Sequence, residues 1–349
     1  MRKVSWSLIL VLVASLLLAA CAAPVAAPAG NGQMAATEAV AETESAGPTR
    51  VALLMPSTIN DISWSQSIYV SLKELQDELG ADKLEIAYSE NMFNVPDAAA
   101  AIRDYASSGY NLVIAHGAQY GDSLMDIAPD FPDVSFAWGT TTRTGKDQGV
   151  ENIFAYEPRG DQAGYVTGVL AAKLTKSKII GLVGPVDAGD AKLHVDGFLA
   201  GVKATDPDVK VNVSFTGSFG DTALAAEAAN THIRAGADVL TGSAQQVVGA
   251  IGVAKENGVP WLGVQADQST AAPEIVLASA IYDWTQLLRD IIAMREAGTM
   301  GGEVLQLTYA NGGIRTIYSD QLPAEAVEAA KAAEAGLADG SIMIVAEPR

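Results

Sequence analysis

The chain has 349 residues, of which 49% are hydrophobic, and its 41 acidic and 22 basic side chains give a formal net charge of −19. This acidic balance argues against nucleic acid as a partner and against electrostatic docking on anionic lipid headgroups. Cys21 is the only cysteine, so the chain cannot form an internal disulfide or a thiolate metal cluster. We expect no metal and no cofactor.

The first 49 residues precede the folded body. A basic start, an apolar run over Val4–Ala20 and small residues before Cys21 predict a signal peptide over residues 1–20. The position of Cys21 directly after Leu-Ala-Ala resembles a bacterial lipobox, in which cleavage leaves a lipid-modified cysteine that holds the protein on a membrane. An ordinary signal peptide or an uncleaved anchor is the alternative, since about 17 apolar residues can just span a bilayer. Residues 21–49 are rich in Ala, Pro, Gly and Glu and predict a flexible tether.

From Arg50 onward, short apolar runs alternate with amphipathic stretches. The runs have the length of buried strands and cover residues 50–55, 83–89, 110–116, 134–139, 178–184, 210–215, 237–242 and 259–264. Helical periods lie between most of them; the first begins at Trp64 and continues through Ile68, Leu72, Leu75 and Leu79. This alternation predicts an α/β fold with parallel sheets that are covered by helices on both faces.

About 300 residues exceed what one such sheet needs, so we predict two doubly wound lobes. The predicted N-terminal lobe comprises residues 50–154 and 264–297, and the predicted C-terminal lobe comprises residues 155–263 and 298–349. The segment 303–319 contains two apolar runs around Asn-Gly-Gly and predicts a β-hairpin. A last, Ala-rich helix is expected from Pro323 to about Ala338.

Polar and aromatic residues follow several predicted strands. Ligands of open α/β sheets bind beyond the carboxyl ends of the strands, so these residues are candidates for a ligand site. They are Asn60, Asp61, Trp64, Gln119, Asp122, Phe219, Gln245, Asp267, Tyr282, Asp283 and Trp284. Lys and Arg are absent from nearly all of these strand exits, and no GxxxxGK[ST] phosphate loop occurs. The pattern favours a flat, uncharged, hydrogen-bonding ligand that stacks on aromatic rings.

Each candidate also has a purely structural interpretation. Trp64 matches the core period of its helix, and His116 can be a hydrogen-bonded histidine at a strand end. Asp122 and Asp221 can cap helices, which is a common role for an aspartate after a strand. Tyr282 and Trp284 can be packing residues. Catalytic motifs such as GxSxG and HExxH are missing, so we do not expect an enzyme.

Three stretches together resemble the basic membrane protein family of bacterial lipoproteins, which includes purine nucleoside receptors of ABC transporters. They are GYVTGVLAAKLTKSKIIGLVG, FTGSFGDTALAAEAANTHIRAGADVL and GVQADQSTAAPEIVLASAIYDW, and the resemblance covers residues 50–341. It implies two lobes that are joined by three crossovers and close on the ligand, as in type I periplasmic binding proteins.

The resemblance also implies roles for single residues. Asn60 or Asp61 would lie near the ligand, and a purine would stack between Phe219 and Trp64 or a neighbour of Trp64. Asp122 would face the base, and Asp267 would hold the ribose hydroxyls. The chain departs from the family where nucleoside-binding members carry a sugar-contacting lysine, because Tyr282 or Asp283 stands there.

The sequence therefore predicts a monomeric, lipid-anchored substrate-binding protein on the extracytoplasmic face of the cell membrane. It would bind a nucleobase or nucleoside and deliver it to an ABC permease and its ATPase. A sensor of the same fold, a receptor for another flat heterocycle such as a flavin, and an extracellular nucleoside hydrolase are the alternatives.

Overall fold

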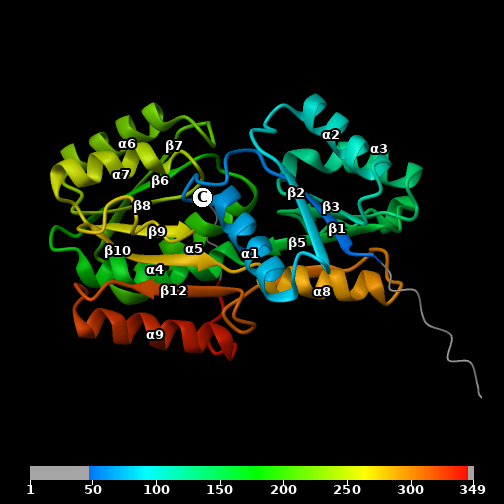
Figure 1. Ribbon diagram of the computed structural model, residues 1–349. Helices are drawn as coiled ribbons and strands as arrows, with labels where there is room; N and C mark the ends of the chain where they lie inside the picture. The colour runs from blue at the N-terminus through cyan, green and yellow to red at the C-terminus, as the bar shows by residue number, and fades with distance from the viewer. Residues whose placement is uncertain (1–46, 345–349) are drawn as a thin grey trace, which may run out of the picture. The chain divides into compact units, whose positions relative to one another are not determined.

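The computed structural model describes residues 47–344 (Figure 1). The predicted signal peptide, the predicted lipidation of Cys21 and nearly all of the predicted tether lie outside the described residues. No helix in the described part of the chain is long and apolar enough to cross a membrane. Residues 47–344 form two α/β lobes, each built on one six-stranded sheet, as the alternation of apolar runs and helical periods predicts.

The first lobe has six parallel strands in the order β11-β5-β4-β3-β1-β2. Their bounds are β1 (Thr49–Leu54), β2 (Leu84–Ser89), β3 (Leu112–Ala115), β4 (Ser135–Gly139), β5 (Ile153–Pro158) and β11 (Val304–Leu307). The helices are α1 (Trp64–Leu79), α2 (Val95–Ser107), α3 (Gly121–Ile127) and α8 (Thr285–Glu296), with short 3₁₀ turns η1 (Ala118–Tyr120), η2 (Ala128–Asp130) and η3 (Lys146–Gln148). Val51 and Leu53 of β1 pack in one core cluster with α1 and α8, while Ala52 and Leu54 pack in another with α2 and α3. Because both faces are buried, the strand reads as a continuous apolar run.

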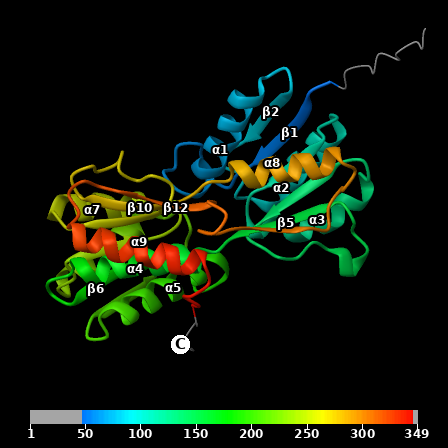
Figure 2. The ribbon, with the colours of Figure 1, turned by 90° about the horizontal axis from the view of Figure 1, so that it is seen from below.

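The second lobe repeats this arrangement with the strand order β12-β10-β9-β8-β6-β7. Its strands are β6 (Ile179–Gly184), β7 (Lys210–Phe215), β8 (Val239–Gly242), β9 (Trp261–Gln265), β10 (Val276–Tyr282) and β12 (Ile314–Tyr318). All of them are parallel except β12, which runs antiparallel to β10 at the edge. Its helices are α4 (Gly160–Leu174), α5 (Gly189–Thr205), α6 (Thr222–Arg234), α7 (Val247–Asn257) and α9 (Ala324–Ala338). The first core of this lobe joins α4, α5 and α9, which lie together in Figure 2, and the second joins α6 and α7.

Helices α4 and α5 approach each other closely through glycines. A methyl group on Gly164 or Gly168 of α4 would overlap the carbonyl oxygen of His194 or Phe198 in α5. Gly197 and Gly201 of α5 face the carbonyl oxygens of Asp161 and Tyr165 in the same way. Since α4 begins directly after the first crossover, this contact fixes the start of the second lobe.

The chain passes between the lobes three times, as the family resemblance implies. The crossovers follow β5 at Arg159, follow β10 at Asp283, and lie between β11 and β12. The strand pairing corrects the lobe boundaries that the sequence suggests. The predicted boundary at residue 154 falls inside β5. β10 lies in the second sheet, whereas the sequence predicts residues 264–297 in the N-terminal lobe. β11 lies in the first sheet, whereas the sequence predicts residues 298–349 in the C-terminal lobe.

The physical reason lies in the connection between β9 and β10. These strands are parallel neighbours, but residues 266–275 between them contain no helix. The prediction of the lobes depends on strands that alternate with helices. Because no helix separates β9 from β10, the sequence does not indicate that β10 joins the second sheet.

The predicted hairpin around Asn311 is wrong. The two strands β11 and β12 form, but β11 pairs with β5 and β12 pairs with β10, so they belong to different sheets. The Asn311 side chain accepts hydrogen bonds from the backbone N–H of Thr308 and of Gly313, both at 3.0 Å, and stabilises a turn at the third crossover. An Asn-Gly-Gly turn has the same local chemistry whether or not its flanking strands pair with each other.

Candidate functional site

A cavity of about 360 Å³ lies between the lobes at the carboxyl ends of their strands. The first lobe lines it with Pro56, Trp64, Phe93, Gly117, Ala118, Gln119 and Thr140. The second lobe contributes Pro185, Val186, Ala188, Gly189, Asp190, Ala191, Phe219, Ser243, Ala244, Gln245 and Gln265. Its position is where open α/β sheets bind ligands, and its size suits a small molecule.

Two phenylalanine rings face each other in this cavity, one from each lobe. Phe93 follows β2 and Phe219 follows β7, which are the edge strands at equivalent positions in the two sheets. They are 51% and 39% exposed, and their ring centroids are 6.5 Å apart at an interplanar angle of 49°. Large apolar rings that remain exposed inside a cleft are available to stack on a ligand.

The sequence prediction included Phe219 but missed Phe93. The signal that could have found Phe93 is the shared topology of the lobes. Each phenylalanine lies in the loop between the second strand of its lobe and a helix capped by a following polar residue, Asn94 for α2 and Asp221 for α6. The predicted capping role of Asp221 is confirmed, because its carboxylate accepts hydrogen bonds from the N–H groups of Ala223 and Leu224, each at 3.0 Å.

Trp64 lines the cavity but is mainly a core residue. It is 6% exposed, belongs to the same core cluster as Ile68, Leu72 and Leu75, and stacks one ring face on His116 with centroids 4.1 Å apart. Its Nε1 donates to the His116 carbonyl oxygen at 3.1 Å. The structure therefore places Trp64 in the core, as its helical period predicts. Little of its ring surface is free for a ligand.

His116 is fully buried and hydrogen-bonded. Its Nδ1 lies 2.8 Å from the Tyr156 hydroxyl and its Nε2 lies 3.2 Å from the Trp64 carbonyl oxygen. Burial lowers the pKa of His116 to about 3, so the imidazole is neutral at pH 7. This arrangement matches the structural interpretation of His116 and leaves it no free nitrogen for catalysis.

The predicted ligand contacts in the loop after β1 do not reach the cavity, and Asp61 instead stabilises the start of α1. The Asp61 carboxylate accepts hydrogen bonds from the N–H groups of Ser63, Ser65 and Gln66 at 2.9 to 3.1 Å, at the start of α1. Burial raises the pKa of Asp61, while these three donors oppose that rise. Asp61 and the exposed Asn60 do not line the cavity, nor does Asp122, which is exposed in the first turn of α3.

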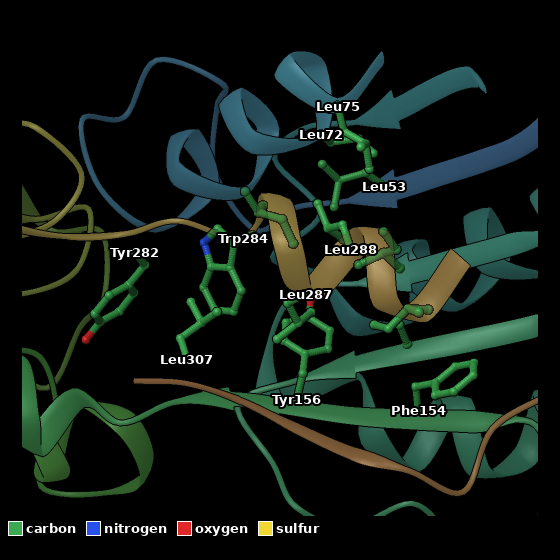
Figure 3. Packing of buried hydrophobic residues seen from close by; sticks show 14 of the residues in the cluster. Leu53, Leu72, Leu75, Phe154, Tyr156, Tyr282, Trp284, Leu287, Leu288 and Leu307 are labelled. Atoms are coloured by element: carbon green, nitrogen blue, oxygen red, sulfur yellow. The ribbon is translucent and has the colours of Figure 1, made fainter. Parts of the chain in front are cut away.

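The predicted residues after β9 and β10 also lie outside the cavity lining. Asp267 accepts a hydrogen bond from the N–H of Ser269 at 2.9 Å, and Asp283 pairs with Arg315 at 3.4 Å. Tyr282 and Trp284 are buried in the core beside α8, where the Tyr282 hydroxyl points away from Trp284 (Figure 3). Of the eleven predicted contacts, the structure brings together at the cavity only Trp64, Gln119, Phe219 and Gln245.

Polar contacts join the lobes next to the cavity. The Ser63 hydroxyl donates to Gln265 Oε1, which also accepts from the Ala244 N–H at 3.2 Å. Three cavity residues that are not glycine have left-handed backbone conformations: Thr140 (φ 61°), Ala244 (φ 69°) and Gln265 (φ 78°). Such conformations are costly and collect at ligand sites, which supports a binding role for this cavity.

Asp190 dominates the electrostatics of the cavity. Burial, together with the charges of Glu157 and Asp161, raises the pKa of Asp190 to about 7, and the nearby amide side chain of Gln265 partly opposes this rise. Among the described residues that line the cavity there is no Lys or Arg. Within residues 47–344, no group of three His, Cys, Asp or Glu side chains could hold a metal ion.

Known proteins are similar to this chain in sequence or in fold. A purine-binding protein from Brucella abortus is 28% identical over 282 residues, which cover 81% of this chain and 79% of that protein. The transcriptional activator protein med of Bacillus subtilis is 27% identical over 254 residues, which cover 72% of this chain and 77% of the relative. A solved ABC transporter solute-binding protein from Conexibacter woesei aligns with a TM-score of 0.71 and 22% identity over 85% of this chain and 99% of that one, which shows the same fold.

The family resemblance found in the sequence is confirmed by a match that spans nearly the whole body. Residues 48–342 match the family described as ABC transporter substrate-binding protein PnrA-like (Bmp). The matched range includes both sheets and every residue that lines the cavity between them. The chain therefore belongs to the PnrA-like (Bmp) family of ABC transporter substrate-binding proteins.

Proposed function

We propose that this protein binds a purine nucleobase or nucleoside between Phe93 and Phe219 and delivers it to an ABC permease for uptake. The observation that carries this proposal is the pair of exposed rings, one from each lobe, that face each other across the cavity. The Brucella abortus relative, which is named a purine-binding protein, supports the same ligand class.

The separation of the two rings suits an intercalated ring after a small adjustment. Carbon atoms in van der Waals contact lie about 3.5–4.0 Å apart, so a ring held between two others needs about 7–8 Å. The present separation is 6.5 Å with a tilt of 49°. A small rotation of the phenylalanines would therefore admit a purine and leave both of its faces covered.

The chemistry of the lining favours a ligand without phosphate. Aromatic and aliphatic side chains cover most of the wall, and amide groups come from Gln119, Gln245 and Gln265. The one charged side chain that residues 47–344 contribute to the lining is acidic. A phosphorylated nucleotide would meet Asp190 without a compensating cation in the described lining, and burial of unpaired charge is costly. Nucleosides and nucleobases fit better.

Binding would work by closure of the lobes. Ligand contacts from both Phe93 and Phe219 require the lobes to approach, so the ligand shifts the population toward the closed form by its difference in affinity between the two forms. The protein would act as a monomer and catalyse no reaction. Recovery of unchanged ligand from the purified protein would exclude the nucleoside hydrolase alternative.

The location of the protein is also part of the proposal. Cys21 would carry the lipid anchor, and the predicted tether over residues 21–49 would join the body to the extracytoplasmic face of the cell membrane. Cys21→Ser should abolish labelling by radioactive palmitate, because the thiol accepts the first lipid. Equal labelling of the variant and the wild type would overturn the anchor.

The direct test of the ligand class is mass spectrometry of small molecules that copurify with the full chain. We expect a purine base or nucleoside at up to one molecule per protein. A copurifying flavin or sugar in place of a purine would overturn the proposed ligand.

A sensor is the second candidate, because one relative is named a transcriptional activator. The two functions differ in what a deletion of the gene does. Loss of uptake of radiolabelled adenosine supports transport, whereas normal uptake with an altered transcriptional response to purines supports sensing.

A further inference from the structure

Asp190 is the only charged residue among the described residues that line the cavity. It follows β6 and is the second residue of α5. Although the residue as a whole is partly exposed, its Oδ1 atom is buried and has no hydrogen-bond partner among the described residues, while the Gln265 side chain lies near the carboxyl group. A buried carboxylate oxygen without a donor is unfavourable, so its retention in a ligand cavity calls for a partner from the ligand.

Two more polar atoms on the second-lobe side of the cavity are also buried without a hydrogen-bond partner in residues 47–344. Ser243 Oγ and Gln245 Oε1 are buried and lack a hydrogen-bond partner within the described protein, and both residues line the cavity. They follow β8, which is the neighbour of β6 in the second sheet, so the two loops leave the same edge. The carboxylate and the amide oxygen are acceptors, and the hydroxyl can accept or donate. The complementary ligand group is one that donates hydrogen bonds.

The charges around Asp190 also favour a ligand group that donates hydrogen bonds. Glu157 at the end of β5 and Asp161 in the first turn of α4 are both negative and both act on Asp190. Arg159 could offset them, but its guanidinium already forms a bidentate pair with Asp161, at 2.9 and 2.6 Å. An electropositive donor from the ligand is favoured in this field.

The remaining titratable groups near Asp190 supply no cation. On α5, Lys192 already pairs with Asp196, and burial lowers the pKa of His194 to about 4, so that its imidazole is neutral at pH 7. On β10, the Tyr282 hydroxyl lies close to Gly160 beside Asp190. Burial raises the pKa of Tyr282, so it stays a neutral hydroxyl, which supplies no charge, and it forms no hydrogen bond with Asp190 or with another described residue.

We propose that Asp190 and Gln245 form a specificity subsite that selects ligands with a hydrogen-bond donor group at the end facing the second lobe. The donor is either an exocyclic amino group of the base or the vicinal hydroxyls of a ribose, since both present two hydrogens to two acceptors. This inference rests on the proposed function, because the phenylalanine pair holds the ring whose donor end reaches Asp190.

The subsite couples binding to a proton. The ionised carboxyl of Asp190 is an acceptor on both oxygens, whereas the protonated form carries a donor hydrogen on one of them. Ligand donors therefore favour the ionised form, so the ligand lowers the pKa of Asp190 from its free value of about 7 and releases a proton. The affinity of wild type should therefore weaken as the pH falls below about 7, by up to about tenfold per pH unit. A carboxyl that has only a structural role would give no such profile.

The test is titration calorimetry of the full chain with adenosine, adenine, purine riboside and 2′,3′-dideoxyadenosine between pH 5.5 and 8. Titrations at pH 6.5 in phosphate and in Tris, which differ in ionisation enthalpy, measure the protons released. Asp190→Asn keeps the shape of the side chain, and Gln245→Leu removes the second acceptor without the charge. Asp320→Asn, at an exposed site of the second lobe outside the cavity lining, is the matched control.

We expect wild type and Asp320→Asn to release a proton and to lose affinity at low pH. Asp190→Asn should bind adenosine about 10- to 100-fold more weakly at pH 8, with no proton release. Gln245→Leu should bind more weakly but keep the pH profile. The effect of Asp190→Asn should vanish for purine riboside if Asp190 takes the amino group, and for dideoxyadenosine if it takes the hydroxyls.

Two results overturn the inference, and they differ in what else they overturn. If purines bind to wild type and Asp190→Asn with equal affinity and the same pH profile, the donor subsite is wrong while purine binding stands. If no purine binds to wild type, the proposed function fails and the subsite fails with it. Urea unfolding of each variant shows whether a loss of binding reflects a loss of folding.

Discussion

The aromatic residues at the cavity differ in how much of their ring surface is already in contact with protein. Trp64 is 6% exposed and has one face against His116, whereas Phe93 is 51% exposed. Trp284 approaches Trp64 edge-on at 5.5 Å, so the indole of Trp64 is surrounded by other rings. Truncation of Trp64 should therefore destabilise the fold much more than truncation of Phe93.

Trp64→Ala should lower the free energy of unfolding by about 3–5 kcal/mol, as the removal of large aromatic side chains from cores does. Phe93→Ala, the matched control at an exposed ring, should change it by no more than about 0.5 kcal/mol. Urea unfolding without ligand measures both. A nearly unchanged urea midpoint for Trp64→Ala would contradict the core position of Trp64.

The sequence could predict which residue types gather at the cleft but not which of them point into it. The helical period of Trp64 identified it as a core residue, while its place after β1 made it a candidate contact, and only packing against His116 decides between them. Asp61 and Asp267 follow strands as predicted, but their carboxylates accept hydrogen bonds from nearby backbone N–H groups. Asp190 was missed because a lone acid in the first turn of a helix carries no periodic signal.

Asp190 should make the stability of the protein depend on pH in an unusual direction. Its pKa is raised from 3.8 to about 7, so the folded state binds more protons than the unfolded state between these values. Its contribution is therefore fully present below about pH 4 and is lost as the pH rises to about 7.

Asp190→Asn should remove this loss. The difference in free energy of unfolding between Asp190→Asn and wild type should grow in favour of the variant from pH 4.5 to pH 8, by about one to a few kcal/mol. Urea unfolding at several pH values measures this difference. A difference that is constant across the range would show that the carboxyl of Asp190 titrates normally.

At the scale of elements, the glycines of α4 and α5 place two helices in backbone contact. The sequence predicts helical periods between most of the strands, but the close approach of α4 and α5 depends on glycines, which have no side chains and leave no trace in a hydrophobic pattern. The same limit explains the wrong hairpin, because the sequences of β11 and β12 do not show their strand partners. Local structure was therefore predicted more fully than the pairing between distant segments.

Gly197→Ala should destabilise the protein by about 1–3 kcal/mol or more, because the added methyl would overlap the carbonyl oxygen of Asp161. Gly252→Ala is the matched control in α7, where an added methyl has no neighbour within 4 Å. That control should stabilise the helix by about 0.5–1 kcal/mol. Thermal or urea unfolding of both variants checks the pair, and equal effects would contradict the close packing of α4 on α5.

At the scale of the whole body, two lobes with three crossovers place a cavity where both sheets end. The core cluster of α1 and α8 also includes Val264 and Ala280 of the second sheet, so the lobes share packed residues beside the crossovers. Two lobes joined in this way are suited to rigid-body closure. Small-angle scattering should show a smaller radius of gyration when a purine saturates the protein, and identical curves with a bound purine would contradict closure.

The central claim is that a purine binds between Phe93 and Phe219, and calorimetric titration of the full chain with adenosine and guanosine tests it most directly. We predict that at least one of them binds with one site per chain. Phe93→Ala and Phe219→Ala should each weaken its affinity by about 1–3 kcal/mol, the range of aromatic–base stacking, while the urea midpoint stays nearly fixed. Unchanged affinity in both variants, or no binding of either purine to wild type, would contradict the account.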